Sequence, residues 1–278
     1  MSNTALKSPD TGRQVVYDMP AEEYHKLERF SASGIKKILT SAQDFWTTSW
    51  MNPDKYEPKS DVFSLGTAYH TRILEGREVF DQRYAVKPEC DKRTTAGKAI
   101  YAEWREKFPD AEEIDERTYG EINNAAAITQ FSGGKAEVTV LWDDEETGVP
   151  MKSRLDYLNP GVISDLKTFS NPHGMDLNRL LASHIVKYKY HVQTAVYRTA
   201  VPEHDFTFVF QQVGAANNCI VREFPSDLLL ADAGRNLMRF GINRFAEMYG
   251  KFGTKPWYDT FKDEAFTDES FPLYALEE

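Results

Sequence analysis

Two carboxylates and one ammonium group lie close together in the middle of the chain. Asp156 is late in the segment 152–158, and Asp165 and Lys167 lie in the segment 162–167. Both segments alternate apolar and polar residues around an Asn-Pro-Gly sequence, which predicts a β-hairpin or a tight strand connection. Side chains two positions apart on a strand share a face. Asp165 and Lys167 therefore point the same way, and strand pairing can bring Asp156 beside them.

Such a group suits a hard divalent cation. Mg²⁺ takes carboxylate oxygens, waters and phosphate oxygens as ligands. A bound cation makes water more acidic and neutralises charge on a phosphate, and a nearby lysine can position the attacking water or stabilise the developing charge. The alternative is a surface hairpin with a cross-strand Asp–Lys pair, worth under about 1 kcal/mol. This stretch alone does not decide between the two interpretations.

Two further elements carry polar residues that could join this group. A helix is predicted for 61–75, and in it Gly66 and His70 are four residues apart and share a face. The small residue one turn from His70 leaves room for a ligand or for close backbone packing. Glu137 begins a strand predicted for 137–142. It is either a third carboxylate near the metal or a charge on an edge strand.

A long helix predicted for 176–201 carries Gln193 and Tyr197, again four residues apart on one face. That pair could hold water, a phosphate or a base, or it could be two ordinary helix side chains. Arg93 and Lys98 lie in a polar, glycine-containing segment, 91–98, that is expected to be a mobile loop and could contact DNA phosphates. A solvated loop is the competing interpretation.

Composition sets the class of protein. The 278 residues are 41% apolar and 27% charged, which is typical of a globular protein with a sizeable core. We expect a disordered N-terminus over 1–18 and a single domain over 19–278. The two cysteines argue against a disulfide framework, fit a cytoplasmic location, and exclude a four-cysteine iron–sulfur cluster within this chain. No apolar run is long enough for a membrane span.

The formal net charge of −10 is unusual for a nucleic-acid-binding protein. If the chain binds DNA, its positive charge must be local, for example along a groove or channel.

In sequence order, these candidates resemble the motifs of the PD-(D/E)xK nuclease superfamily. Within it they most resemble the RecE-type exonuclease (exonuclease VIII) group with its RecB-like motifs. The resemblance extends over residues 30–250, and the segment SASGIKKILTSAQDFW looks like the start of that domain. Each motif is weak alone, but five in the right order are specific. They are Gly66-x-x-x-His70, Glu137, Asp156, Asp165-Leu166-Lys167 and Gln193-x-x-x-Tyr197.

The resemblance implies an α/β fold with a central mixed β-sheet flanked by α-helices, a restriction-endonuclease-like core. It also implies a bound Mg²⁺ or Mn²⁺ ion, Lys167 as the catalytic lysine, and Glu137 as an accessory acid. Gln193 and Tyr197 would help to bind the DNA end or orient the water at the metal. The implied metal ligands are His70, Asp156, Asp165 and the backbone carbonyl of Leu166.

The activity implied is metal-dependent hydrolysis of phosphodiester bonds, degrading linear double-stranded DNA from its ends, in the 5′-to-3′ sense. Relatives in that group can form homo-oligomeric rings with a basic channel, and often work with a single-strand annealing recombinase of phage or prophage origin. The resemblance thus places the protein in recombination or repair, in a bacterial or phage-infected cell.

Two other hypotheses stay open. One is an endonuclease of the same superfamily, although the branch that binds an iron–sulfur cluster needs four cysteines. The other is a non-catalytic DNA-binding or protein-binding module that retains the fold, for which keeping Lys167 would be unnecessary.

Overall fold

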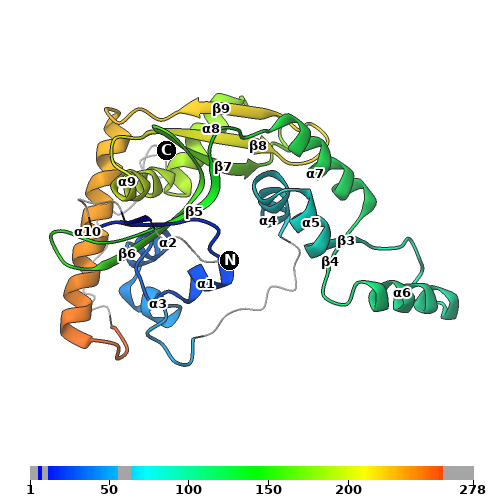
Figure 1. Ribbon diagram of the computed structural model, residues 1–278, viewed down its shortest axis with the longest axis horizontal. Coiled ribbons are helices and arrows are strands. Elements are labelled where there is room, and N and C mark those ends of the chain that lie inside the picture. The colour runs from blue at the N-terminus through cyan, green and yellow to red at the C-terminus, as the bar shows by residue number, and fades with distance from the viewer. Residues whose placement is uncertain (1–5, 8–11, 56–63, 259–278) are drawn as a thin grey trace, which may run out of the picture.

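The computed structural model describes residues 6–7, 12–55 and 64–258. Within them, seven strands form one mixed sheet with helices packed around it (Figure 1). The strands are Leu6–Lys7 (β1), Gln14–Val16 (β2), Lys135–Asp143 (β5), Pro150–Asn159 (β6), Val162–Phe169 (β7), Asp205–Gln212 (β8) and Cys219–Glu223 (β9). Their spatial order is β1-β2-β5-β6-β7-β8-β9, with β7 and β8 parallel and the other neighbours antiparallel. The expected α/β class with a central mixed sheet is confirmed.

The predicted hairpin forms between β6 and β7, but the two strands separate. Among the described residues, their pairing covers only three residue pairs next to the turn. Beyond these pairs, β7 continues along β8 and β6 continues along β5. Phe30 takes over the free edge of β6, donating its N–H to the carbonyl of Pro150 (2.7 Å) and accepting from the N–H of Lys152 (2.8 Å). The sheet therefore opens where Asp156 and Asp165 would face each other.

The main hydrophobic core lies between the sheet and one group of helices. Its aromatic centre brings together Phe30, Phe45, Phe245 and Trp257, whose rings contact one another. The helices that contribute to this core are Ala32–Ile38 (α2), Ala42–Thr47 (α3), Leu177–Lys187 (α8), Tyr190–Ala200 (α9) and Leu229–Phe252 (α10). The short helix Ala21–Lys26 (α1) precedes them in the chain.

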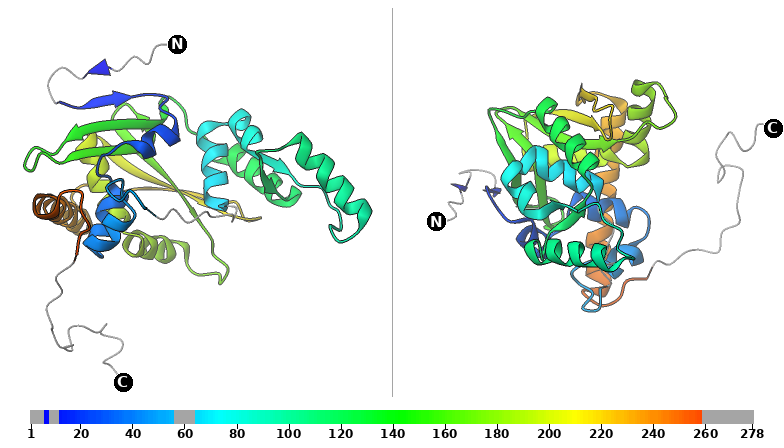
Figure 2. Two further views of the ribbon diagram at one scale, coloured as in Figure 1. Left: turned by 90° about the horizontal axis from the view of Figure 1, so that it is seen from below. Right: turned by 90° about the vertical axis from the view of Figure 1, so that its right-hand side faces the viewer.

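A second, smaller core holds an extension on the other side of the split. Helix Leu65–His70 (α4) begins it and runs directly into a π-helix, Thr71–Glu75. The other elements are Arg77–Arg83 (α5), Tyr84–Val86 (β3), Thr95–Lys107 (α6), Glu112–Ile114 (β4) and Glu116–Ile128 (α7), with β3 and β4 forming a parallel pair. Figures 1 and 2 show α6 at the far end of this extension, away from the sheet.

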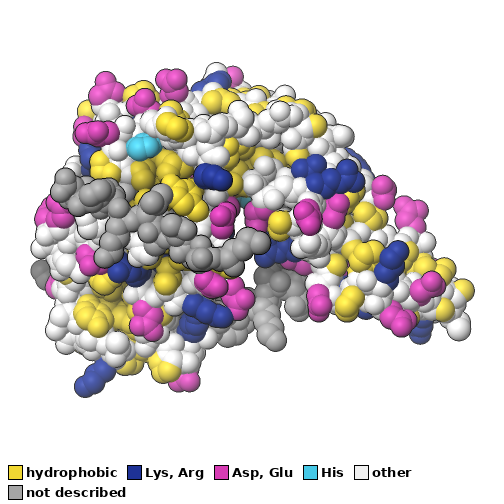
Figure 3. Space-filling model, in the orientation of Figure 1, with side chains coloured by type: hydrophobic (Ala, Val, Ile, Leu, Met, Phe, Trp, Pro, Cys, Tyr) yellow, Lys and Arg dark blue, Asp and Glu magenta, His cyan; other side chains and the backbone are white. Residues whose placement is uncertain are grey.

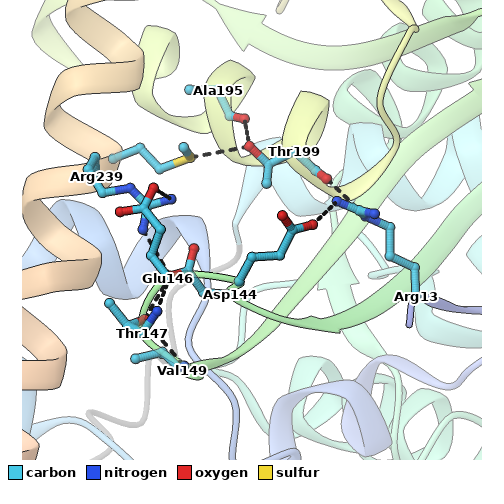
Figure 4. Close-up of polar contacts among 10 residues, drawn as sticks. Arg13, Asp144, Glu146, Thr147, Val149, Ala195, Thr199 and Arg239 are labelled. Atoms are coloured by element: carbon cyan, nitrogen blue, oxygen red, sulfur yellow. Dashed lines mark hydrogen bonds and ion pairs between the residues drawn. The ribbon is translucent and has the colours of Figure 1, made fainter. Parts of the chain in front are cut away.

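The turn between β5 and β6 is held against α10. Arg239 donates to Asp144 Oδ2 (2.8 Å) and forms an ion pair with Glu146 (3.3 Å) (Figure 4). The Asp144 carboxylate also accepts from the backbone N–H of Thr147 (3.0 Å), and Asp144 is 4% exposed. These contacts fix one end of β6, the strand that carries Asp156.

Three expectations from the sequence need correction. The helix expected over 176–201 is two helices, because Lys189 adopts a left-handed conformation (φ +51°) between α8 and α9. Part of the terminus expected to be disordered, Gln14–Val16, is a strand paired with β5. The helix expected over 61–75 becomes a π-helix after His70.

Some expectations fall on residues that the structure does not describe. Residues 61–63 at the start of the expected helix, and residues 1–5, 8–11 and 259–278 of the expected terminus and domain, lie outside the described ranges. Within those ranges, Ser64 caps α4 by accepting from the N–H of Thr67. No helix among the described residues is long and apolar enough to cross a membrane.

Candidate functional site

The two acids and the lysine of the hairpin converge at the point where the sheet splits. Asp156 Oδ2 accepts the backbone N–H of Leu166 (2.8 Å), so its carboxylate bridges the gap between β6 and β7. Asp165 is fully buried, and its Oδ2 forms an ion pair with Lys167 Nζ. The same ammonium donates to the carbonyl of Leu166 (3.5 Å). The spacing of these residues in the sequence therefore predicted their meeting.

These three groups perturb one another strongly. Burial, and then the neighbouring charge of Asp165, raises the pKa of Asp156 well above its usual range. Burial opposes the charge on Lys167, but the carboxylates of Asp165 and Asp156 outweigh it and raise the pKa of that ammonium. The buried Asp165 and the partly buried Asp156 thus share one cation. A further positive charge at this place would stabilise both carboxylates in their ionised form.

His70 reaches the same place from the other side of the split. Its Nδ1 lies 3.9 Å from Asp156 Oδ2. Burial, and then the charge of Lys167, lowers the pKa of His70 to about 4, so the imidazole is neutral near pH 7 and keeps a lone pair for a ligand. Gly66 eases this approach, because a Cβ there would lie 3.2 Å from Thr168 Oγ1 on β7, closer than an ordinary contact.

Helix α9 contributes the two residues expected from its spacing. Gln193 donates through Nε2 to Asp165 Oδ1 (2.9 Å) and to the hydroxyl oxygen of Tyr197 (3.0 Å). Both side chains line the same cavity as Asp156. The structure therefore brings Gln193 and Tyr197 to the acids from the helix that covers them.

Glu137 also lines this cavity, but another residue holds its carboxylate. Arg154 on β6 forms a hydrogen-bonded ion pair with Glu137. Burial raises the pKa of Glu137 and Arg154 opposes that shift. Glu137 has a positive φ of +55° within β5, a costly conformation for a residue other than glycine. Its role as an accessory acid stays a prediction.

The structure does not bring the two expected DNA-contacting residues of the loop to this cavity. Arg93 forms an ion pair with its neighbour Asp91 (3.0 Å), and its side chain is 91% exposed. Lys98 was expected in the loop, but α6 already begins at Thr95, so Lys98 lies in that helix at the far end of the extension (Figure 1). Any contact of Arg93 or Lys98 with DNA would lie outside the cavity.

A basic groove adjoins the acidic centre. The cavity has a volume of about 250 Å³, and the neighbouring groove has about 650 Å³. The two share lining residues of α1, α2 and β6, including Tyr24, Ser33 and Lys152. Acidic and basic side chains are interspersed on the face shown in Figure 3, whereas five cations line the groove, namely Lys26, Arg29, Lys37, Lys55 and Lys152. Glu22 is the acid that lines it among the described residues.

Sequence reasoning missed three cations at this site. Lys152 and Arg154 lie on β6 at two-residue steps from Asp156, so the same alternation that located Asp156 could have found them. Lys36 on α2 also lines the cavity, and its Nζ donates to Gln193 Oε1 (3.1 Å). Ile35 and Ile38 are buried on one side of α2. Lys36 follows Ile35 in the sequence and lies at the edge of that buried side.

The donors at the split fit a hard divalent cation by their chemistry. They are two carboxylates, a neutral imidazole and the carbonyl of Leu166, and the ammonium of Lys167 already contacts both Asp165 and that carbonyl. Asp165 Oδ2 is buried, and the ammonium of Lys167 is its partner. No three His, Cys, Asp or Glu side chains among the described residues are drawn together tightly enough to form a complete metal site.

A split mixed sheet with Asp156, Asp165 and Lys167 at its opening defines a fold of the PD-(D/E)xK superfamily. Residues 31–252 match the family described as "PDDEXK-like domain of unknown function (DUF3799)", and the chain belongs to that family. The expected superfamily is thereby confirmed, while a RecE-type specificity is not established.

A solved structure shows the same fold. A protein from Eubacterium rectale, described as a "Putative exonuclease", aligns with a TM-score of 0.54 at 16% identity, over 94% of this chain and 96% of its own. SSO0001 aligns with a TM-score of 0.30 at 12% identity, over 76% of this chain and 84% of its own, too low to define a shared fold. No curated protein matches the sequence.

Proposed function

We propose that this protein is a metal-dependent nuclease that hydrolyses phosphodiester bonds in DNA. The observation that carries the proposal is the placement of Asp156 and Asp165 on strands that separate between them, with Lys167 against Asp165. A surface Asp–Lys pair would not be buried, and Asp165 is fully buried. Placing two carboxylates together away from water is costly, and Lys167 supplies only one compensating charge. Binding of a further cation best explains why both acids are present.

Asp156, Asp165, His70 and the carbonyl of Leu166 would hold Mg²⁺ or Mn²⁺. When bound, such a cation supplies a more acidic water and neutralises charge on the phosphate. Lys167 would stabilise charge on the attacked phosphate, since its ammonium is fixed beside Asp165. Gln193 holds the Asp165 carboxylate in one orientation through a hydrogen bond of 2.9 Å, which keeps the other oxygen of Asp165 turned toward Lys167.

The proposed substrate is double-stranded DNA, degraded from its ends. The basic groove beside the cavity gives an acidic protein a local surface for DNA phosphates. The description of the E. rectale protein as an exonuclease supports action at ends. The 5′-to-3′ direction, a ring-shaped oligomer, a single-strand annealing recombinase as partner and a cytoplasmic location are proposals that come from the resemblance of the motifs.

The test compares an end-labelled linear duplex with a closed circular duplex, each with Mg²⁺ and with EDTA. An exonuclease releases the label from the linear DNA only, and only with Mg²⁺. Cutting of the closed circle would show an endonuclease instead. Tight DNA binding without hydrolysis in Mg²⁺ or Mn²⁺ would show a binding module and overturn the proposal. Duplexes protected by phosphorothioates at either the 5′ or the 3′ end give the direction.

A further inference from the structure

Lys36 is a cation in the catalytic cavity that the metal-binding group does not need. It comes from α2, and its Nζ donates to Gln193 Oε1 (3.1 Å) and lies 5.2 Å from the centre of the Tyr190 ring. In the described residues Lys36 forms no ion pair, whereas Lys167 is paired with Asp165. An ammonium group has three N–H donors, so the bond to Gln193 leaves donors for another acceptor.

The surroundings of Lys36 make its positive charge expensive. Burial, and then the nearby charge of Lys167, lowers the pKa of Lys36 to about 8. Asp165 acts in the opposite direction, but Gln193 lies between that carboxylate and Lys36. A partly buried ammonium without an acid partner is stabilised when an anion binds next to it. The cavity that Lys36 lines continues into the basic groove through shared residues of α1, α2 and β6.

We propose that Lys36 binds a phosphate of the DNA strand in the catalytic cavity while it holds the Gln193 amide toward Asp165. The inference rests on the proposed nuclease function and adds a substrate contact to it. The two lysines then have different tasks. Lys167 is paired with the acid Asp165, and Lys36, which has no acid partner among the described residues, pairs with DNA.

The hydrogen bonds fix the orientation of the Gln193 side chain. Because Lys36 can only donate, Gln193 Oε1 must face it, and Nε2 must face Asp165 and Tyr197. A phosphate bound by Lys36 would therefore be placed beside the carboxylate that Gln193 holds. This links substrate binding to the geometry of Asp165 through a single amide.

The experiment uses Lys36→Met, Lys36→Arg and a matched control, Lys251→Met, which removes the same charge from the exposed end of α10. Affinity for an end-labelled linear duplex is measured in EDTA by fluorescence anisotropy at several salt concentrations. Values of kcat and KM are measured with Mg²⁺. We expect K36M to weaken DNA binding and raise KM about tenfold, and to lower the salt slope by about 0.9, the loss of one phosphate contact. K36R should restore both, and K251M should match wild type.

Two outcomes overturn the assignment. One is an unchanged affinity and salt slope in K36M. The other is a lower kcat at unchanged KM that K36R does not rescue, which would leave Lys36 a purely structural residue. Lys36→Gln, which keeps a donor toward Gln193, carries the same test should K36M not fold. If wild type binds DNA but does not hydrolyse it, the proposed function fails, while the anisotropy measurements still decide the role of Lys36.

Discussion

Replacing Lys167 by methionine tests whether one ammonium compensates two buried acids. The substitution keeps a side chain of similar length and removes the charge. Asp165 has no exposed side-chain surface, so water cannot replace the missing cation there, whereas Asp156 is 14% exposed. What remains is the bond from Gln193 to Asp165 and the bond from the N–H of Leu166 to Asp156.

The expected loss of stability is large. Removing one partner of a buried ion pair costs about 3–5 kcal/mol. Because the remaining hydrogen bonds stay in place and one acid can take up a proton, we expect the lower end, about 3 kcal/mol. For a chain of this size that corresponds to a fall in Tm of about 6–12 °C. The exposed control Lys251→Met should shift Tm by no more than about 1–2 °C.

The assay is thermal and urea unfolding in EDTA, at about pH 7.5 and about pH 5. An acid whose pKa is raised by folding binds more protons in the folded state than in the unfolded chain, whose Asp pKa is about 3.9. The contribution of Asp156 to stability therefore rises as pH falls from its folded pKa toward that value, and the deficit of K167M should shrink at the lower pH. Mg²⁺ should also stabilise K167M more than wild type, since the variant has one more uncompensated negative charge.

The reasoning is refuted if K167M has the same Tm and the same free energy of unfolding as wild type at the higher pH in EDTA. A deficit that is the same at both pH values would equally refute it, because the cost would then come from packing and not from charge.

Three other perturbations test the site and its support. Asp156→Asn and Asp165→Asn should each lower the rate of hydrolysis of an end-labelled duplex with Mg²⁺ by about 10³-fold, because losing a metal ligand removes several kcal/mol of charge stabilisation. Activity within tenfold of wild type would contradict the ligand assignment. The pKa of His70 is lowered from 6.5 to about 4, so wild type should lose up to about 3 kcal/mol of stability as pH falls through that window. His70→Gln should remove that loss in urea titrations, and an unchanged pH dependence would show that His70 titrates normally. Arg239→Met should lower the free energy of unfolding by about 1–3 kcal/mol, because Asp144 stays buried without this ion-pair partner. A double-mutant cycle with Asp144→Asn that gives no coupling energy would show that this pair does not hold the β5–β6 turn.

The sequence predicted the elements of the candidate site better than the partners of their side chains. Alternation over two short segments placed Asp156, Asp165 and Lys167 on one side of a hairpin, and helical spacing placed Gln193 and Tyr197 on one face. Both periodicities are local properties of the backbone. The break at Lys189 could not be predicted from the sequence for a different reason. Lysine rarely adopts the left-handed conformation, so its residue type does not indicate a break there. That break gives α9 its own direction, separate from α8.

Contacts between distant segments account for the residues that were missed. Lys36 and Gln193 are 157 positions apart, and no spacing rule connects them. Glu137 was expected to be either a third carboxylate near the metal or a charge on an edge strand. It lines the cavity, and Arg154 holds its carboxylate from the neighbouring strand. A strand pattern gives the face of a side chain, whereas the identity of its partner depends on strand register.

The separation of β6 from β7 is the feature that turns a common hairpin into a site, and it has an identifiable cause. β7 is paired along its whole length with β8, and β6 is paired with β5 and, on its other edge, with Phe30. Each strand therefore keeps a pairing partner on its outer edge where the hairpin opens, and the groups on the inner edges need other partners. The side chain of Asp156 then takes the N–H of Leu166 that strand pairing would have used. A hairpin that stayed paired would bring these acids into direct contact, with no room for a cation or a phosphate between them.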